Sequence, residues 1–220
     1  MSRYAVIGLG KFGSWVARTL EELGHQVIAI ESNGALVDRH AEFVSRAVQG
    51  DATDPAVLRG AGVADVDAAV ISMGRNLAAS ILATVALRDL GVRNLYVKAA
   101  TDTEGRALNA LGVTEVIIPE KEAGVRLAHR MGTSEVLDYM PLGEGQSIQE
   151  IAIPAAWVGH SLRTVAPRAQ FGIQVIAVRC ALTEAVHVPP DPDAVLKDSD
   201  ALVVAGADKA LAALPRREAG

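Results

Sequence analysis

The sequence predicts an α/β protein, with a Rossmann-like doubly wound parallel sheet in residues 1–135 and a second, smaller α+β domain in residues 136–220. Two observations lead to this prediction. Short runs of Val, Ile and Ala alternate with stretches of helical spacing as far as Glu135, and beyond it the apolar runs are separated by Gly, Pro and Asp turns. The 220 residues are 50% hydrophobic but only 4% aromatic, so the cores should be mainly aliphatic.

Six apolar runs are expected to form the parallel strands of the first domain, at residues 4–8, 26–30, 44–48, 68–72, 94–98 and 116–118. Between the first two, Phe12, Val16 and Leu20 recur on one face of a helix that should end at Gly24. The same kind of spacing predicts further helices over residues 77–90 and 107–111.

After Pro119 the pattern changes. A helix over residues 121–131 is expected to lead away from the sheet. Strands are then expected at residues 147–153, 173–178 and 201–205, with helices at 162–169 and 209–214. A region of this size with such short strands is too small for a second Rossmann half, so it should form a separate α+β domain.

The charge balance and the apolar runs exclude two classes of function. Lys and Arg number 21 against 26 Asp and Glu, a net charge of −5, and no block of basic residues is present, which argues against nucleic-acid binding. No apolar run reaches about 18 residues, the length that a membrane helix needs. The protein is therefore expected to be cytoplasmic and to reach a membrane only through another subunit.

The best-defined motif is GLGKFG at residues 8–13, which follows the first strand and opens a helix. Gly8 allows a tight turn, Gly10 lets a pyrophosphate approach the backbone, and Gly13 lets the helix pack on the strand. Glu31, at the end of the next strand, should accept hydrogen bonds from ribose hydroxyls and repel a 2′-phosphate. The motif therefore predicts NAD or an adenine nucleotide as the ligand.

Polar residues follow the third strand at the same edge of the sheet. Asp51, Ala52 and Thr53 stand where open α/β sheets bind ligands, so a contact with the adenine side is expected there. Asp54, directly before Pro55, equally fits a helix cap.

Two further strands end at that edge. Gly74 and Arg75 follow the fourth strand, and Lys98 ends the fifth. Arg75 fits a solvated residue at a helix start as well as it fits a phosphate ligand, whereas Lys98 at a strand terminus is the better cationic candidate.

No set of residues points to catalysis. The single cysteine, Cys180, follows an apolar strand and is expected to be a buried thiol. The histidines are scattered, and the first three are expected at the surface: His25, His40, His129, His160 and His187. We therefore expect a protein that is not an enzyme, with an NAD-dependent oxidoreductase or a soluble nucleotide or redox sensor as the alternatives.

The order of motifs resembles the RCK (regulator of potassium conductance) subunits of Trk/Ktr-type potassium uptake systems. The similar segments are YAVIGLGKFG, VIAIESN, VQGDATD, AAVISMGRN, LYVKA and IIPEKEAG, followed by QFGIQVIAV and PDPDAVLKDSDALVVAG. The resemblance implies binding of ATP, ADP or NAD(H), and homodimers that assemble into an octameric ring. It also implies gating of a membrane-embedded potassium-translocating subunit, peripheral to the inner face of the membrane.

The resemblance also implies roles for single residues. Asn33 would lie near the adenosine, and Lys11 stands where an Arg often reaches the terminal phosphate of a nucleotide in the neighbouring subunit. Glu120 matches an acidic residue associated with a divalent cation, Mg or Ca, but it also fits a plain helix N-terminal charge. Motifs and resemblance together assign to the nucleotide Gly8, Gly10, Lys11, Phe12, Gly13, Glu31, Asn33, Asp51, Ala52, Thr53, Gly74, Arg75 and Lys98.

In some relatives the second domain binds cyclic di-AMP in a groove at the dimer interface. The matching stretch here consists of Arg168, Ala169, Phe171, Gly172 and Ile173. A plain dimer interface fits the same stretch, and KDSD at residues 197–200 departs from the usual Gly-Asp turn of the family.

Overall fold

A computed structural model describes residues 1–74, 76–132, 136–180 and 182–215. The chain divides into two compact units, Met1–Lys121 and Glu122–Gly220. Their division falls before the expected boundary at residue 135, because most of helix α6 (Pro119–Gly132) is grouped with the second unit. Within that unit, the His129 ring stacks on Tyr139 of strand β7 (Val136–Gly143).

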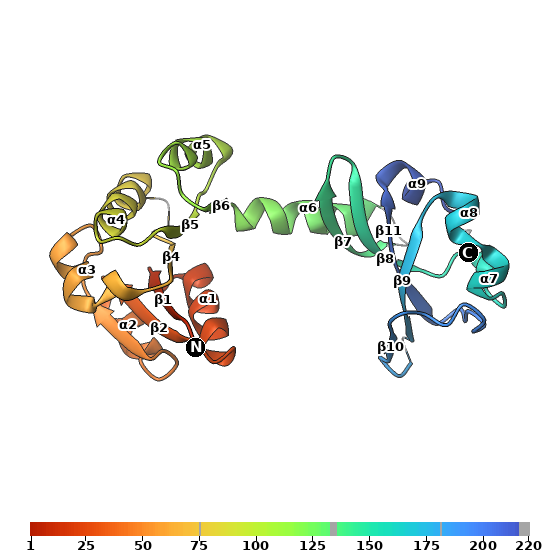
Figure 1. Cartoon of the computed structure of the whole chain (residues 1–220), viewed down its shortest axis with the longest axis horizontal. Helices are drawn as coiled ribbons and strands as arrows, with labels where there is room; N and C mark the ends of the chain where they lie inside the picture. The colour runs from red at the N-terminus through yellow and green to blue at the C-terminus, as the bar shows by residue number, and fades with distance from the viewer. Residues whose placement is uncertain (75, 133–135, 181, 216–220) are drawn as a thin grey trace. The chain divides into compact units, whose positions relative to one another are not determined.

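The first unit contains a six-stranded parallel sheet in the order β3-β2-β1-β4-β5-β6 (Figure 1). Its strands are β1 (Arg3–Ile7), β2 (Gln26–Glu31), β3 (Arg46–Gln49), β4 (Ala68–Ile71), β5 (Asn94–Lys98) and β6 (Glu115–Ile117). The strand order reverses between β1 and β4, and such a switch point opens a crevice at the carboxyl ends of the strands. The predicted Rossmann-like doubly wound sheet is thus confirmed.

Helices connect these strands: α1 (Lys11–Glu22), α2 (Gly34–His40), α3 (Pro55–Ala61), α4 (Leu77–Asp89) and α5 (Asp102–Ala110), with a short 3₁₀ turn at Val63–Asp65. Side chains cap four of them, because Asn33, Asp54, Asn76 and Thr101 each accept a hydrogen bond from a first-turn amide. The cap expected at Asp54 is therefore confirmed. Helix α2 was not predicted, since it is short and buries no residue.

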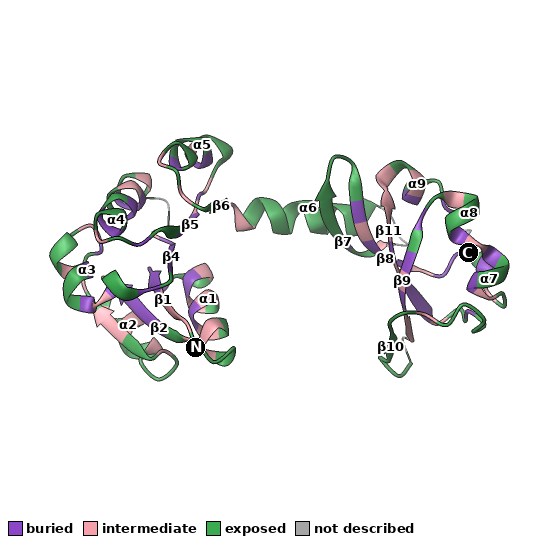
Figure 2. Cartoon of the chain, in the orientation of Figure 1, coloured by how far each residue is buried: buried purple, intermediate pink, exposed green. Residues whose placement is uncertain are grey.

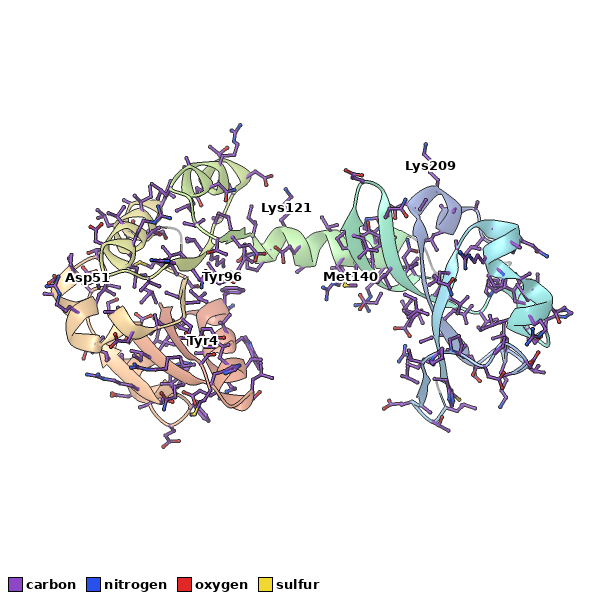
Figure 3. The ribbon with its side chains drawn as sticks, in the orientation of Figure 1. Tyr4, Asp51, Tyr96, Lys121, Met140 and Lys209 are labelled. Carbon is purple, nitrogen blue, oxygen red and sulfur yellow. The ribbon has the colours of Figure 1, made fainter. Side chains whose placement is uncertain are left out.

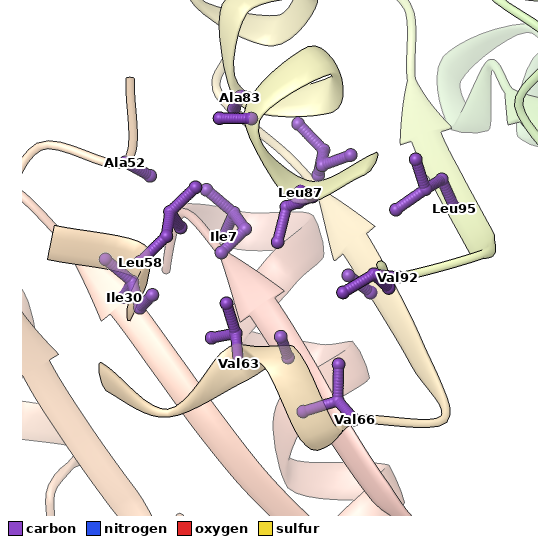
Figure 4. Packing of buried hydrophobic residues seen from close by; sticks show 14 of the residues in the cluster. Ile7, Ile30, Ala52, Leu58, Val63, Val66, Ala83, Leu87, Val92 and Leu95 are labelled. Atoms are coloured by element: carbon purple, nitrogen blue, oxygen red, sulfur yellow. The ribbon is translucent and has the colours of Figure 1, made fainter. Parts of the chain in front are cut away.

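Aliphatic side chains fill both faces of this sheet. On one face, Ile7, Ile30 and Ile71 pack with Leu58 of α3 and Leu87 of α4, in the cluster that Figure 4 shows in part. On the other face, α1 packs on a smaller cluster of Val6, Leu9, Ala17, Val27, Ala29 and Val70. The two clusters hold the helices against the sheet, and they thereby position the loops after β1, β2, β3 and β4 at one edge of it.

The second unit contains a five-stranded antiparallel sheet in the order β10-β9-β11-β8-β7. The remaining strands are β8 (Gln146–Ala152), β9 (Gln174–Cys180), β10 (Val186–His187) and β11 (Asp200–Ala207), and a 3₁₀ turn lies at Ala155–Trp157. Helices α7 (Leu162–Val165), α8 (Pro167–Phe171) and α9 (Asp208–Ala212) contribute to one apolar cluster around Ile153, Ile173 and Leu202. The expected second α+β domain is confirmed.

Three details of the second unit differ from the prediction. The helix expected over residues 162–169 is two helices, because Ala166 is left-handed at φ 46° and Pro167 starts the second one. Strands β7 and β10 were not predicted. β7 has one buried residue, Tyr139, and otherwise exposed or half-buried ones, and β10 has only two residues, so neither shows a clear apolar pattern.

Candidate functional site

A cleft of about 580 Å³ opens at the carboxyl edge of the parallel sheet. It lies at the β1/β4 switch point, and the loops after β1, β2, β3 and β4 form its walls. The lining residues are Ile7, Gly8, Gly10, Ile30, Glu31, Ser32, Leu36, Gly50, Asp51, Ala52, Thr53, Ser72, Met73, Gly74, Asn76, Ala78, Ala79 and Leu82. A cleft of this size and position suits a nucleotide.

The three glycines of the loop after β1 play different parts. Gly8 has φ 91°, and a Cβ there would lie 2.2 Å from the Ser72 carbonyl oxygen, so the turn demands glycine. A Cβ on Gly13 would lie 1.9 Å from the Gly8 oxygen, because α1 packs directly against the loop. A Cβ on Gly10 would meet nothing within 4 Å, which leaves open space on the cleft side for a phosphate.

The first turn of α1 is available to an anion. Gly10 is its N-cap residue, and no side chain caps the helix. Helix N-termini leave backbone N–H groups without partners and carry a partial positive charge. A diphosphate at the open side of Gly10 would meet both.

Glu31 fastens the loop to the end of β2. Its Oε2 accepts a hydrogen bond from Leu9 N at 2.8 Å, and its Oε1 accepts from Asn33 N at 2.9 Å and from Ser32 Oγ at 3.2 Å. An ionised carboxylate has about four acceptor positions, so it can take a ribose hydroxyl as well. Glu31 therefore positions the glycine loop, a function that the sequence did not reveal.

Asp51 shapes the wall that β3 contributes. Its Oδ1 accepts hydrogen bonds from Thr53 N at 2.9 Å and from Thr53 Oγ1 at 2.8 Å, and both bonds hold the pKa of the Asp51 carboxyl below its usual value. Ala52 next to it is only 3% exposed, while Asp51 itself is exposed. The cleft thus has an ionised carboxylate beside an apolar surface. An adenosine fits both, because its amino and hydroxyl groups donate hydrogen bonds and its adenine ring has an apolar face.

Several predicted residues do not line this cleft. Asn33 Oδ1 accepts from Ala35 N at 3.0 Å, so that side chain caps α2. Lys11, Phe12 and Gly13 lie in the first turns of α1 but are not among the lining residues. Arg75 lies outside the described residues.

Lys98 and Glu120, predicted separately for a nucleotide and a metal, pair with each other. Lys98 Nζ is 2.7 Å from Glu120 Oε1 and 6.0 Å from the centre of the Phe12 ring. The Lys98 side chain is 17% exposed and that of Glu120 is 68% exposed. Among the described residues, no three His, Cys, Asp or Glu side chains come close enough to hold a metal ion.

The fourth strand contributes more of the cleft than its sequence suggested. Ser72, Met73 and Asn76 line the wall after β4, and Ala78 and Leu82 of α4 extend it. Leu82 is 55% exposed, which leaves an apolar surface beside the polar loops. A leucine on a helix ordinarily predicts core, so no sequence signal distinguishes it.

The second-unit stretch expected to bind cyclic di-AMP is partly accessible. Arg168 and Ala169 are exposed on α8, and Gly172 ends that helix with φ 70°. Phe171 is half-buried against Trp157, with ring centres 5.5 Å apart, and Ile173 is buried in the core. Arg168, Ala169 and Gly172 are thus accessible to a ligand, whereas Ile173 is part of the core.

Two other expectations are corrected. Cys180 is half-buried rather than buried, and hydrogen bonds from the Thr183 side chain and from the backbone of Leu182 and Thr183 lower the pKa of its thiol. His25 is half-buried rather than at the surface, since it packs edge-on against Tyr4 with ring centres 5.2 Å apart. Its Nδ1 is buried without a hydrogen-bond partner in the described chain.

The strand order, the glycine loop and the acid at the end of β2 together define a Rossmann-type nucleotide-binding domain, joined here to a small antiparallel domain. The TrkA-N domain family matches residues 4–119, and the TrkA-C domain family matches residues 148–217. The chain therefore belongs to the family of TrkA-N and TrkA-C domain proteins. No helix formed by the described residues combines the length and the apolar character that a bilayer crossing requires.

Similar proteins of known name agree with this membership. The chain is 36% identical to the Ktr system potassium uptake protein C of Bacillus subtilis (strain 168), over 92% of this chain and 91% of that protein. It is 32% identical to the Ktr system potassium uptake protein A of Vibrio alginolyticus, over 96% and 94%.

Among solved structures, the GsuK channel superposes with a TM-score of 0.72 at 21% identity, over 97% of this chain. The chain spans 38% of that channel chain. The NAD-bound GsuK channel gives a TM-score of 0.68 at 20% identity. Both likenesses concern the fold.

Proposed function

We propose that the protein is a cytoplasmic regulatory subunit of a potassium uptake system, which binds a nucleotide in the first unit and changes the activity of a membrane-embedded potassium-translocating subunit. The observation that carries this proposal is the open cleft at the glycine loop, in a chain that matches potassium uptake proteins over more than nine-tenths of its length. The chain works as a homodimer that assembles into an octameric ring.

In this proposal the cleft holds ATP, ADP or NAD(H). The diphosphate lies at Gly10 and the first turn of α1, and a ribose hydroxyl donates to Glu31. The adenine lies along Ala52, beside the ionised Asp51. The nucleotide can change the ring only as far as it binds one conformation more tightly than another.

In this proposal a divalent cation binds at the Glu120 carboxylate, which already pairs with the Lys98 ammonium. A Mg or Ca ion that binds Glu120 repels the Lys98 ammonium, because both are positive, so the ion weakens the pairing of Lys98 with Glu120. Such an ion takes about six or more oxygen ligands, and Glu120 supplies at most two. Phosphate oxygens and a second subunit would supply the remaining ligands.

Calorimetry with ATP, ADP and NADH tests the nucleotide assignment. Lys11→Ala should reduce the preference for ATP over ADP, and Glu120→Gln should reduce the effect of Mg on ATP affinity. Lys121→Ala and Glu122→Gln are the matched controls, because both residues are exposed and neither lines the cleft. Unchanged preferences in both test variants would remove Lys11 and Glu120 from the proposal, and turnover of NADH would favour an oxidoreductase.

Native mass spectrometry tests the assembly and the partner. The purified protein should carry a nucleotide and have the mass of an octamer, and it should co-purify with a membrane protein that transports potassium. A monomer without nucleotide would contradict the proposal.

The second unit is proposed to bind cyclic di-AMP across the dimer, through the exposed Arg168, Ala169 and Gly172 and the half-buried Phe171. Arg168→Ala should weaken cyclic di-AMP binding, whereas Arg163→Ala, which removes another exposed arginine of the same unit, should not. Equal affinities for the two variants would reduce this stretch to a dimer interface.

A further inference from the structure

A second cavity, of about 210 Å³, lies wholly within the second unit. Helix α6, strands β7 and β8, and helix α9 with the residues after it form its walls. Most of these walls are apolar, and the lining residues are His129, Val136, Tyr139, Gln149, Ile151, Ala152, Pro154, Asp208, Leu211, Ala212, Leu214 and Pro215. Nothing in the proposed nucleotide or cyclic di-AMP binding uses this cavity.

A hydrogen-bonded chain of three side chains joins strand β8 to helix α9. Ser147 Oγ donates to Asp208 Oδ1 at 2.6 Å, and Gln149 Nε2 donates to Ser147 Oγ at 3.0 Å. Ser147 is 0% exposed and Gln149 is 9% exposed. The direction of the chain follows from chemistry, because an ionised carboxylate only accepts. The single hydroxyl proton of Ser147 therefore goes to Asp208, and Gln149 must present its NH₂ group to Ser147.

Both ends of this chain are consequently acceptors. Gln149 Oε1 and the second oxygen of Asp208 accept no hydrogen bond from the described residues. Gln149 and Asp208 both line the cavity, and neither free oxygen is among the buried polar atoms without a partner, so both oxygens are accessible from the cavity. A ligand that donates hydrogen bonds and carries a positive charge would satisfy both ends.

The aromatic wall of the cavity favours the same kind of ligand. The His129 and Tyr139 rings stack at 3.7 Å with an interplanar angle of 6°. The Tyr139 phenol is neutral at physiological pH, as an ordinary phenol is, and burial, and after it the negative charge of Asp208, raises its pKa further. A neutral aromatic face and a carboxylate attract a cation together.

We propose that this cavity binds a small organic cation, with an ammonium or amidinium group on an apolar body. The charged group donates to Asp208 and Gln149, and the apolar body lies against Val136, Ile151 and Leu211. An engineered cavity of about 150 Å³ holds benzene, so the cavity here suits a molecule of roughly the size of a substituted benzene. The described residues around it do not form a metal site.

Benzylamine is the probe that tests this proposal on the full chain. Its binding is measured by calorimetry and by saturation-transfer NMR at constant ionic strength, beside benzyl alcohol, benzoate and toluene. Benzylamine should bind at least about tenfold more tightly than benzyl alcohol, because a hydrogen bond between charged groups is stronger than a neutral one. Benzoate should not bind.

Two variants localise the site. Asp208→Asn keeps an oxygen for Ser147 but removes the charge, so benzylamine affinity should fall at least about tenfold while the fold is kept. Ala212→Leu, at an exposed helix position on the wall, should block the cavity. Asp193→Asn is the matched control, because it removes a carboxylate of the same unit that does not line this cavity, and it should leave the affinity unchanged.

Several outcomes would overturn the proposal. Equal binding of toluene and benzylamine would make the cavity merely apolar. Unchanged benzylamine affinity in both Asp208→Asn and Ala212→Leu would place the binding elsewhere. Displacement of benzylamine by KCl, with the same loss in Asp208→Asn, would assign the site to an inorganic cation. Circular dichroism of each variant confirms that loss of binding is not loss of fold.

Discussion

Gly10 and Gly13 lie three residues apart in one loop, yet an added methyl group would have opposite consequences at the two positions. At Gly13 the methyl would overlap the Gly8 oxygen, so Gly13→Ala should lower the free energy of unfolding by about 3 kcal/mol. At Gly10 it would enter open space, so Gly10→Ala should fold normally but bind nucleotide about tenfold or more weakly, because the methyl occupies the approach of the diphosphate. Urea unfolding and nucleotide calorimetry separate the two effects.

Gly24→Ala is a useful third variant for that comparison. Gly24 has φ 83° but also meets nothing within 4 Å, so its substitution strains the backbone without touching the cleft. It should lose stability and keep nucleotide affinity. A Gly10→Ala protein that binds nucleotide as well as the unsubstituted chain would place the diphosphate elsewhere.

Thr53 supplies both hydrogen bonds that lower the pKa of Asp51. Thr53→Val removes the smaller, side-chain contribution and keeps the backbone one, so the Asp51 pKa should rise part of the way toward its usual value. A carboxyl with a lowered pKa in the folded state stabilises the protein above its unfolded pKa of about 3.9, and this stabilisation is lost as the pH falls through the folded pKa. The variant should therefore lose less stability on acidification.

Carboxyl NMR titration measures this shift directly. The Asp193 carboxyl, whose pKa is lowered by the Arg163 side chain, serves as the internal control and should titrate unchanged. An Asp51 pKa that stays in place would show that the hydroxyl contributes nothing.

At this scale the sequence predicted residues whose role is set by a local motif. Gly8, Gly10, Glu31 and Asp51 all line the cleft, because a glycine loop and a strand end define their positions. It did not predict the pairing of Lys98 with Glu120, since a contact between distant residues depends on how β5 and α6 are placed.

At the scale of elements, the break between α7 and α8 depends on Ala166. This residue has φ 46°, a conformation that costs a non-glycine residue about 1–2 kcal/mol. Ala166→Gly should remove this strain and, after the added freedom of the unfolded chain, raise the free energy of unfolding by about 0.5 kcal/mol. Thermal and urea unfolding measure the change.

Ala169→Gly provides the contrast, because Ala169 lies within α8. Glycine at that position should lower the free energy of unfolding by about 0.5–1 kcal/mol. A stabilised Ala169→Gly or a destabilised Ala166→Gly would contradict the assigned conformations. Ala166 also explains why one helix was predicted over residues 162–169, where the structure has α7 and α8. Apolar spacing records which side chains are buried, and it does not record a single left-handed backbone angle.

Tyr139 of strand β7 stacks on His129 of α6 and feels the negative charge of Asp208 of α9. The raised pKa of this phenol means that the folded state holds its proton more tightly than the unfolded state. Its contribution to stability is complete below the unfolded pKa of about 10 and is lost as the pH rises through the folded pKa. Tyr139→Phe should remove this alkaline loss, as measured by unfolding between about pH 8 and 11.

Tyr96→Phe is the comparison for that experiment, because Tyr96 belongs to β5 of the first unit, where Figure 3 labels it. It should leave the alkaline loss in place. β7 itself escaped prediction because Tyr139 is its single buried residue, and one buried position sets no period.

For the whole molecule, the division into two units predicts separable folding. Each unit has its own apolar cluster, and α6 contributes no buried residue, as its exposed ribbon in Figure 2 shows. A chain of residues 1–121 should therefore unfold cooperatively and bind nucleotide within about threefold of the full chain. Urea unfolding followed by calorimetry tests this, and a fragment that does not fold would mean that the second unit stabilises the first.

The overall architecture was the part best predicted from the sequence. The alternation of apolar runs and helices fixes a parallel sheet, and the glycine motif fixes its binding edge. The unit boundary could not be predicted, because the spacing of α6 shows that a helix is present but not which contacts its residues make.

The pairing of β1 has a consequence for how the protein is made. β1 is synthesised before the other five strands of its sheet, yet it pairs with β2 on one side and with β4 on the other. β1 therefore lacks its second neighbouring strand until β4 has been synthesised as far as Ile71. The sheet is complete only when β6 has followed. Domains fold as units during synthesis, so the first unit can fold while the second unit is still being translated.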